Sequence, residues 1–449
     1  MSSGAYYPSF FEISLCLNSN EDVTKGGDGE IFPNLTDNVF STFFHEYVHY
    51  LQNITSLGGV YHTYFTFSNL YNSIKEIQDY NIKNIYLPYL SNEDEWFSHF
   101  EGNDGEEDEI KDFEIISVSI VSSKPSRGVN IGENLFYEDV IIDYRADIDF
   151  DCTKDYFQLG EYQISESMAY IMERCCFPEK VVGKLLYPYN VVEKLASYLC
   201  PQLSEKDDFL IYLVALCDFS MQFSNPGKIM YMVLSDIKDS KFNPKTPEEI
   251  YSFRCNNTIC SLDGQSFNIS YTDNYIQEAT FLKKWLIGKM DDVDVYVRYF
   301  ETVFNYAIHL RKEKPFFMLD IARNRNIRKQ GMLFDIIDEI GTPMINFTYD
   351  TEIIETSDIY LPRSFDADNG DGQIQFYLQA NQRLYNTLIY GETGCGLINV
   401  CEECCANVFD DVICANEPWK QSLKKEHCPY GFIWSRYLRN VTPVYSVDD

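Results

Sequence analysis

The sequence predicts an α+β fold with a mainly helical core, an antiparallel β-sheet and a long C-terminal region. Apolar residues recur at helical spacing in most segments, whereas residues 113–151 show the alternation that is typical of strands. The chain has 449 residues, of which 45% are hydrophobic and 16% aromatic, so it can fill a sizeable core. We divide it into a first domain, residues 1–240, and a C-terminal helical region with a cysteine-rich tail, residues 241–449.

A buried helix is predicted from Thr36 or Asp37, either of which fits the N-cap position, to Leu57. Apolar side chains cover nearly its whole circumference, which is typical of a helix that is buried on all sides. The pair Gly58–Gly59 predicts where this helix ends, and a second helix is expected over residues 61–79. Four polar residues interrupt the apolar surface, and their burial requires a physical explanation: His45, Glu46, His49 and Gln52.

The remaining elements are predicted from the same kind of spacing. Residues 1–35 suggest an extended element with a glycine-rich loop, and residues 91–114 an acidic solvated loop or, alternatively, a surface for a basic partner. At least two antiparallel strands are expected over residues 113–151, and a helix is expected to start near Ile164 or Ser165. Further helices are expected over residues 190–200, 206–224, 227–237, 276–289, 293–312, 329–339 and 372–389.

The charge of the chain excludes some classes of partner. Lys and Arg number 36 against 69 Asp and Glu, which gives a formal net charge of −33. Such a surface repels phosphate backbones and anionic lipids, so we expect no nucleic-acid partner and no membrane partner. The N-terminal stretch lacks the basic and apolar parts of a secretory signal. We therefore expect a soluble, cytoplasmic protein whose fourteen cysteines are reduced thiols, buried hydrophobes or metal ligands.

The most specific chemical signal is the motif H-E-x-x-H at residues 45–49. Residues four apart share one face of a helix, so His45 and His49 can reach the same metal ion. Glu46 follows the first histidine, at the position where a carboxylate can take a proton from a metal-bound water. Without a metal, two buried imidazoles and a carboxylate would each need a separate partner. The motif therefore predicts a Zn²⁺ site with hydrolase chemistry.

A catalytic zinc site usually has three protein ligands and leaves the fourth position to water. A third histidine in the pattern H-E-x-x-H-x-x-G-x-x-H is excluded, because Gln52 and Thr55 occupy the corresponding positions. His62 would have to return past the double glycine and is a weaker candidate. A glutamate from a second helix is the other common solution, and Glu166 fits best because small neighbours permit close helix approach. Two other glutamates remain open as the third ligand: Glu173 and Glu161.

The string HEYVHYLQ, followed downstream by ESMAY, resembles the HExxH metallopeptidases whose third zinc ligand is a glutamate, the gluzincins. The chain is also similar to uncharacterised bacterial HExxH proteins. The resemblance implies a zincin-like core with these roles: zinc ligands His45, His49 and Glu166, and general base Glu46. Some gluzincins carry an aspartate four residues after the third ligand, where this chain has Tyr170. Asp218 is a candidate partner for a ligand histidine, although a core carboxylate with partners elsewhere is the simpler interpretation.

The C-terminal tail carries a second, weaker metal signal. Cys401 and Cys404 have the C-x2-C spacing that lets two thiolates hold one zinc ion. Cys414 with Cys428, or with His427, would complete such a structural site, but at irregular spacing. The alternatives are reduced, partly buried cysteines or redox-sensing thiols.

Two functions from different classes are compatible with these patterns. The first is a zinc-dependent peptidase that hydrolyses peptide bonds of an intracellular protein, as a housekeeping enzyme or as a conditional effector in defence or toxicity. An unrestrained intracellular peptidase would be harmful, so a regulatory protein partner is compatible with this role. The second is a non-catalytic interaction protein, in which zinc stabilises the fold and an acidic surface binds a basic partner.

Overall fold

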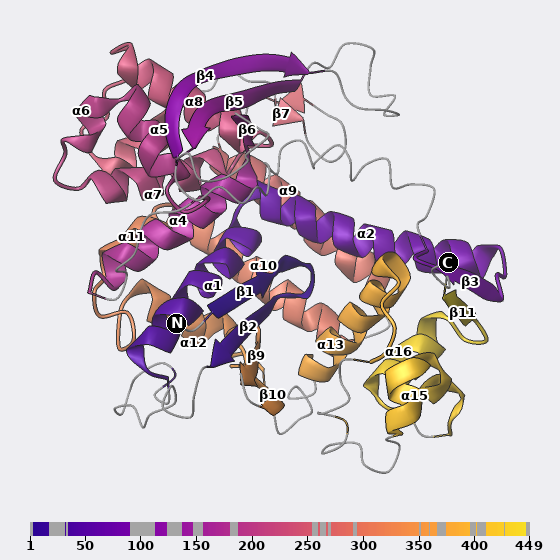
Figure 1. The fold of residues 1–449 in the computed structure, drawn as a ribbon. Helices are drawn as coiled ribbons and strands as arrows, with labels where there is room; N and C mark the ends of the chain where they lie inside the picture. The colour runs from indigo at the N-terminus through magenta and orange to yellow at the C-terminus, as the bar shows by residue number, and fades with distance from the viewer. Residues whose placement is uncertain are drawn as a thin grey trace.

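Helices dominate the described part of the chain, and small sheets accompany them (Figure 1). The predicted α+β class with a mainly helical core is therefore confirmed. The computed structural model describes residues 3–17, 32, 35–89, 113–123, 137–146, 156–179, 187–253, 259–260, 266–267, 271–290, 294–349, 352–358, 360–365, 374–395, 401, 410–425 and 427–445. Most of the acidic stretch at residues 91–114 lies outside these residues.

The α-helices of the first 240 residues are α1 (Asp37–Thr55), α2 (Leu57–Asp79), α4 (Glu161–Cys176), α5 (Val191–Leu199), α6 (Pro201–Ser204), α7 (Phe209–Ser220) and α8 (Pro226–Lys238). Those that follow are α9 (Tyr271–Met290), α10 (Asp294–Glu313), α11 (Phe317–Arg323), α12 (Met332–Ile340), α13 (Ile374–Tyr385), α15 (Asp411–Asn416) and α16 (Pro429–Tyr437). Short 3-10 or π segments are η1 (Pro8–Phe10), η4 (Pro247–Ser252), η7 (Asn386–Tyr390) and η8 (Pro418–Leu423). Within the described helices, none combines the length and apolar character needed to cross a lipid bilayer.

The strands form four small sheets within the described residues. They are β1 (Ser3–Tyr7), β2 (Glu12–Leu17), β3 (Asn84–Leu87), β4 (Phe113–Ser123), β5 (Tyr137–Ala146), β6 (Tyr156–Leu159), β7 (Ile259–Cys260), β8 (Ser266–Phe267), β9 (Met344–Tyr349), β10 (Glu352–Asp358) and β11 (Thr442–Tyr445). Strands β4 and β5 pair antiparallel, as the alternating pattern of residues 113–151 predicts, and β6, which lies beyond that range, pairs antiparallel with β5. The largest sheet has the order β1-β2-β9-β10, with β2 and β9 parallel. Elements from both sides of the predicted boundary at residue 240 thus share one sheet, while the boundary itself stays a prediction.

Helix α1 lies at the centre of this arrangement and packs against α2, α4, α10, β1 and β2 (Figure 1). The Thr36 side chain accepts a hydrogen bond from the Val39 amide and caps its start. The prediction for its end was wrong, because Gly58–Gly59 belongs to the first turn of α2. Ser56 caps that helix by accepting from the Gly59 amide at 3.1 Å. A Cβ atom at Gly59 would overlap the last turn of α1, so glycine here permits a tight helix–helix corner.

Helix α4 begins three residues earlier than the apolar spacing predicts. Its cap is Gly160, whose amide donates to the Gln163 side chain at 2.8 Å. Glu161 is therefore the first residue of the helix instead of preceding it, and Glu166 lies in the second turn. The first turn includes the polar residues Glu161 and Gln163, so the spacing of apolar residues does not indicate it. Elements that the sequence analysis missed include α11 and the β9–β10 pair.

Asp218 of α7 is a core carboxylate with partners elsewhere, as the simpler interpretation of the sequence has it, and not the candidate partner of a ligand histidine. Its two carboxylate oxygens accept from the Arg311 guanidinium at 2.6 and 2.8 Å, and the Tyr251 hydroxyl donates to it at 2.7 Å. Arg311, which is fully buried, also donates to the backbone carbonyl of Thr55 at 2.7 Å. This ion pair ties the end of α1 to α7 and α10, so Asp218 anchors the helix that carries the motif.

We expect Asp218→Asn to destabilise the protein by about 3–5 kcal/mol, because the change leaves the buried Arg311 charge without its counterion. Urea unfolding measures this free energy. The exposed pair between Arg323 and Glu248, at 2.6 Å, supplies the control, and Glu248→Gln should cost less than about 1 kcal/mol. Equal effects of the two changes would contradict this account. A selective loss of zinc affinity in folded Asp218→Asn would instead restore the histidine role.

Candidate metal centre

Helices α1 and α4 bring two imidazoles and one carboxylate to a common point. Oε2 of Glu166 lies 3.3 Å from Nε2 of His45 and 3.4 Å from Nε2 of His49. The four-residue spacing puts both imidazoles on one face of α1, and the Glu166 side chain reaches them from α4. Within the described residues, these three side chains are the only group of three or more metal-binding residues whose ligand atoms lie within 4.8 Å of one another.

The Nδ1 atoms of both rings already have oxygen neighbours. Nδ1 of His49 lies 2.8 Å from Oε1 of Gln52, and Nδ1 of His45 lies 3.4 Å from Oε2 of Glu173. The Gln52 amide is itself fixed, because it donates to the Ser165 carbonyl at 3.0 Å. Acceptors at Nδ1 favour the tautomer that keeps the lone pair on Nε2, the atom that faces the centre of the group.

The distances fit a tetrahedral ion. With bonds of about 2.0–2.1 Å, neighbouring ligand atoms of a tetrahedral zinc lie roughly 3.3 Å apart, close to the separations from Glu166. Nε2 of His49 is buried and makes no hydrogen bond within the described part of the chain. A buried polar atom without a hydrogen bond is costly, and a metal ion would satisfy it. Two imidazoles and a carboxylate are a common donor set for catalytic zinc, so these residues fit the ion.

The electrostatics of the group favour positive charge at its centre. Burial lowers the pKa of His45, but Glu166, Glu173 and Glu46 outweigh burial and raise that pKa to about 10. Burial likewise lowers the pKa of His49, and the Glu166 carboxylate more than offsets it. Burial would raise the pKa of Glu166, yet the two imidazoles hold it well below its usual range. Each shift has the same cause, the attraction between the carboxylates and the protonated forms of the two imidazoles.

Glu46 stands beside this group without belonging to it. Its side chain is 7% exposed and makes no hydrogen bond or ion pair within the described part of the chain. Gly4 of β1 approaches it so closely that a Cβ atom there would lie 2.8 Å from Oε1. Burial raises the pKa of Glu46, against the opposing charges of His45 and His49. A buried, unpaired carboxylate with a raised pKa is suited to accept a proton.

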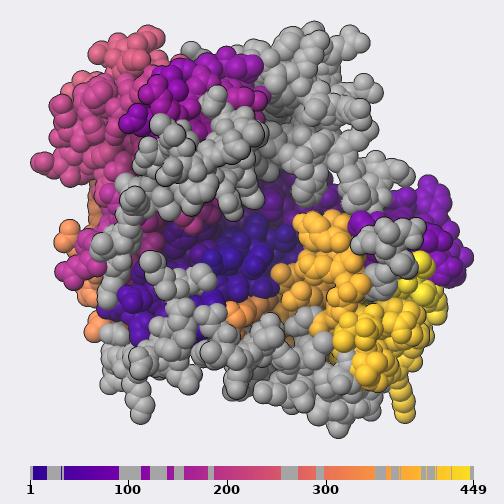
Figure 2. Space-filling model, viewed as in Figure 1, coloured from indigo at the N-terminus to yellow at the C-terminus, as the bar shows by residue number. Residues whose placement is uncertain are grey.

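The group lies in a cleft of about 450 Å³. In Figure 2 the indigo N-terminal residues lie in a hollow between the pink elements above and the orange C-terminal elements. Strand β1 lines one side of the cleft with Gly4, Ala5 and Tyr6, and the start of α4 lines another. Tyr189 also lines it, with its ring centroid 5.8 Å from that of His45. Burial, followed by the charge of Glu166, raises the pKa of Tyr189, so its hydroxyl stays protonated.

The alternative third ligands occupy other places. Glu173 lies on the Nδ1 side of His45 and accepts from the Ser41 hydroxyl at 2.5 Å. Glu161 and His62 line the same cleft but do not belong to the group of ligand atoms. Glu166 is therefore the carboxylate that joins the two histidines, while zinc binding itself stays a prediction.

The predicted cysteine site cannot be assembled from the described residues. Cys404 lies outside them, and Cys401, Cys414 and Cys428 are each buried. The Gln421 amide donates to Sγ of Cys414 at 3.1 Å, and the Gly431 amide donates to Sγ of Cys428 at 3.3 Å. Their burial fits packing in the C-terminal region, and a structural zinc ion there stays a prediction.

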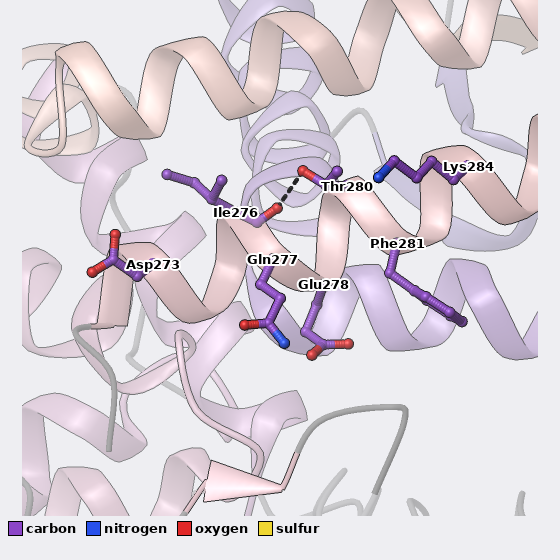
Figure 3. A pocket seen from close by; sticks show the side chains of 7 residues that line it. All are labelled: Asp273, Ile276, Gln277, Glu278, Thr280, Phe281 and Lys284. Atoms are coloured by element: carbon purple, nitrogen blue, oxygen red, sulfur yellow. Dashed lines mark hydrogen bonds between the residues drawn. The ribbon is translucent and has the colours of Figure 1, made fainter. Parts of the chain in front are cut away.

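Two other cavities in the described residues show no comparable chemistry. One of about 420 Å³ lies along α9, where Figure 3 shows its lining side chains on a single helix. Its charged residues are of both signs, Asp273, Glu278 and Lys284, and Thr280 is bonded to the Ile276 carbonyl. Another, of about 560 Å³, contains His309 among several carboxylates, but no three of its residues form a metal-binding group.

Sequence reasoning missed three functional candidates of different kinds. Gln52 had a signal, because it is a polar residue on an apolar helix three positions after His49. Glu173 was considered only as a ligand, although its place one helical repeat after Glu166 keeps it on the same side of α4. Tyr189 had no signal, since nothing in the sequence distinguishes it from the other 33 tyrosines.

Glu173→Gln should lower zinc affinity about 10–100-fold, because the loss of its charge weakens the basicity and orientation of His45. Competition with a chromophoric chelator measures this affinity. Glu179→Gln, an exposed residue just beyond α4, is the matched control and should bind zinc as the unchanged protein does. Unaltered affinity in Glu173→Gln would show that the 3.4 Å contact with His45 has no part in metal binding.

Comparison with known proteins finds no matching family model, no matching curated protein and no matching solved structure.

Proposed function

We propose that this protein is a zinc-dependent peptidase with a zincin-like helical core. The observation that carries the proposal is the convergence of His45, His49 and Glu166 in a cleft that also holds Glu46, whose carboxylate is unpaired in the described residues. A purely structural zinc site does not require an unpaired carboxylate beside its ligands. Structural sites are also usually closed by four protein ligands, and here three meet at the edge of a cleft.

The roles of the side chains follow from their places in the cleft. Zinc bound here would lower the pKa of a coordinated water and polarise a carbonyl group. Glu46 accepts the proton of the attacking water and returns it to the leaving amine. Tyr189 lines the same cleft, with its ring 5.8 Å from that of His45, and its hydroxyl donates a hydrogen bond to the oxygen on which negative charge develops.

The edge of a strand next to the metal centre supports a peptide as substrate. Among the described strands, β1 is at the end of its sheet, with β2 as its neighbour, and three of its residues line the cleft. The free edge of such a strand can pair with an extended chain through backbone hydrogen bonds. We include in this proposal that the substrate is an intracellular protein. We also include a conditional role, either defence-like or toxin-like, and both parts rest on the sequence.

The proposal is tested by removing and restoring the metal. The purified protein is stripped with a chelator, reloaded with Zn²⁺ and incubated with a library of peptides, and new termini are identified by mass spectrometry. We expect one zinc per chain at this centre, and hydrolysis that stops on stripping and returns on reloading. One zinc per chain with no cleavage of any peptide would favour the non-catalytic, zinc-stabilised interaction protein instead.

Tyr189→Phe should lower kcat roughly 10²-fold with little change in zinc affinity, because it removes one donor to the developing oxyanion. Steady-state kinetics with a cleaved peptide measures the effect. Tyr170→Phe is the control, since the Tyr170 ring packs 5.4 Å from Tyr189 but does not line the cleft. Similar losses in both variants would attribute the effect to packing rather than to the hydroxyl.

A further inference from the structure

We propose that Tyr6, Asn53 and His62 form a subsite of the cleft that binds an uncharged amide side chain, that of Gln or Asn, on a substrate residue next to the bond that is cut. This inference rests on the proposed peptidase function and adds a substrate class to it. These three residues are the amide subsite.

Two neighbouring side chains of the amide subsite have unused hydrogen-bonding capacity. The amide nitrogen of Asn53 donates to the Tyr6 hydroxyl at 2.9 Å and to the Pro8 carbonyl at 3.1 Å. A backbone carbonyl can only accept, so its contact fixes which atom of the Asn53 amide is the nitrogen. Oδ1 of Asn53 accepts no hydrogen bond within the described residues, and the Tyr6 hydroxyl keeps its own proton for a further partner. One acceptor and one donor therefore lie side by side in the lining of the cleft.

His62 adds a third uncharged group to this part of the cleft. A Cβ atom at Gly59 would overlap the backbone of Asn53, so the start of α2 lies directly against the last turns of α1. His62 follows Gly59 by three residues and shares that face of α2. Its imidazole lines the cleft and makes no hydrogen bond or ion pair within the described part of the chain. Burial lowers the pKa of His62, so the neutral ring offers one donor and one acceptor.

An uncharged group that both donates and accepts is needed to satisfy all three side chains. A carboxylate only accepts, an ammonium group only donates, and a hydroxyl has a single proton where an amide has two. The NH₂ group of a Gln or Asn side chain donates to Oδ1 of Asn53, its oxygen accepts from Tyr6, and His62 can bond to either atom. No Lys or Arg is among the described residues that line the cleft, so a carboxylate there would lose its hydration without gaining a cation.

Strand β1 places the amide subsite close to the bond that is cut. Gly4 lies against Glu46, the general base of the proposed mechanism. Tyr6 is two residues further along β1, a rise of about 7 Å, and its side chain points to the same side of the strand. An extended substrate has the same rise per residue. The side chain of a residue next to the scissile bond therefore reaches the subsite.

Peptides that differ at one position test the proposal. They carry Gln, norleucine, Glu or Lys immediately before or immediately after the cleaved bond, and kcat/KM is measured with the zinc-loaded protein. On one side of the bond, we expect Gln to exceed each of the other three roughly 10- to 100-fold, because it alone pairs all three groups. His62→Leu should lower the Gln-to-norleucine ratio roughly fivefold, and the double variant with Tyr6→Phe should lower it to about two or less.

Two matched variants separate hydrogen bonding from packing. His62→Gln keeps a donor and an acceptor at the same place and should retain most of the ratio. His427→Leu removes an exposed imidazole outside the cleft and should keep all of it. Zinc-loaded Glu46→Gln, which we expect not to turn peptides over, should bind the Gln peptide more tightly than the norleucine peptide in calorimetry. Adding His62→Leu should narrow that difference.

Several results would overturn the inference while peptide hydrolysis still stands. They are a full ratio in the double variant, a preference for Lys or Glu, and the absence of any preference in the unchanged protein. An equal loss for every peptide in His62→Leu would also overturn it, because the subsite would then bind the substrate backbone. If no peptide is cleaved or bound, the proposed function fails and this inference fails with it.

Discussion

Glu46→Gln is expected to keep zinc bound and to lower peptide hydrolysis by about 10²–10⁴-fold. The amide has nearly the shape of the carboxylate, so the close approach of Gly4 is preserved. It cannot take the proton from the attacking water, and hydrolysis loses its general base. Zinc content by elemental analysis and kcat/KM on a cleaved peptide, both on the same sample, measure the two parts of the expectation.

The separation of zinc binding from activity is what makes this variant informative. Glu205→Gln makes the same chemical change at an exposed residue and should leave both zinc content and kcat/KM unchanged. Undiminished hydrolysis in Glu46→Gln would contradict the peptidase mechanism. Loss of zinc in the same variant would show that Glu46 helps to hold the metal, against the placement of its carboxylate outside the ligand group.

Glu166→Ala is expected to lower zinc affinity by more than the roughly 10–100-fold that is lost when a residue contacting a ligand, but not the metal, is changed. Hydrolysis should then be abolished at ordinary zinc concentrations. The change removes the oxygen that lies 3.3–3.4 Å from both Nε2 atoms and with it the only anionic ligand of the group. Competition with a chelator and elemental analysis after dialysis measure the loss.

Glu161→Ala provides a matched control on the same helix. Both residues are glutamates of α4 that line the cleft, but only Glu166 contributes an atom to the ligand group. We expect Glu161→Ala to bind zinc normally. If instead Glu161→Ala lost zinc and Glu166→Ala kept it, the assignment of the third ligand would be reversed.

Much of the metal centre could be predicted from the sequence because the H-E-x-x-H motif lies within one short stretch of a single helix. His45 and His49 are separated by one helical turn, so their common face depends only on the helix, and the apolar residues around them predict that helix. Glu166 could be proposed from the small residues beside it, although the structure places it in the second turn of α4 instead of the first. The predicted start of α4 was too late because its first turn includes polar residues, and the spacing of apolar residues does not reveal such a turn.

The residues that orient the histidines were harder to predict, because each contact joins distant parts of the chain. Glu173 reaches His45 across the interface of α1 and α4, and no rule of spacing selects it over Glu161. Asp218 shows the opposite case. It is a buried acid in an apolar helix, which is compatible with a role beside a metal, yet its partner Arg311 lies 93 residues further along the chain.

The sequence by itself determined the motif helix, the two histidines, the adjacent glutamate and the helical α+β class, because these depend on local periodicity and residue chemistry. The tertiary structure alone decided which carboxylate joins the histidines, which residues hold their Nδ1 atoms, and which tyrosines line the cleft. Those choices depend on how α1, α4 and β1 pack against one another. Packing is a property of many weak contacts between distant residues, and no short stretch of sequence records it.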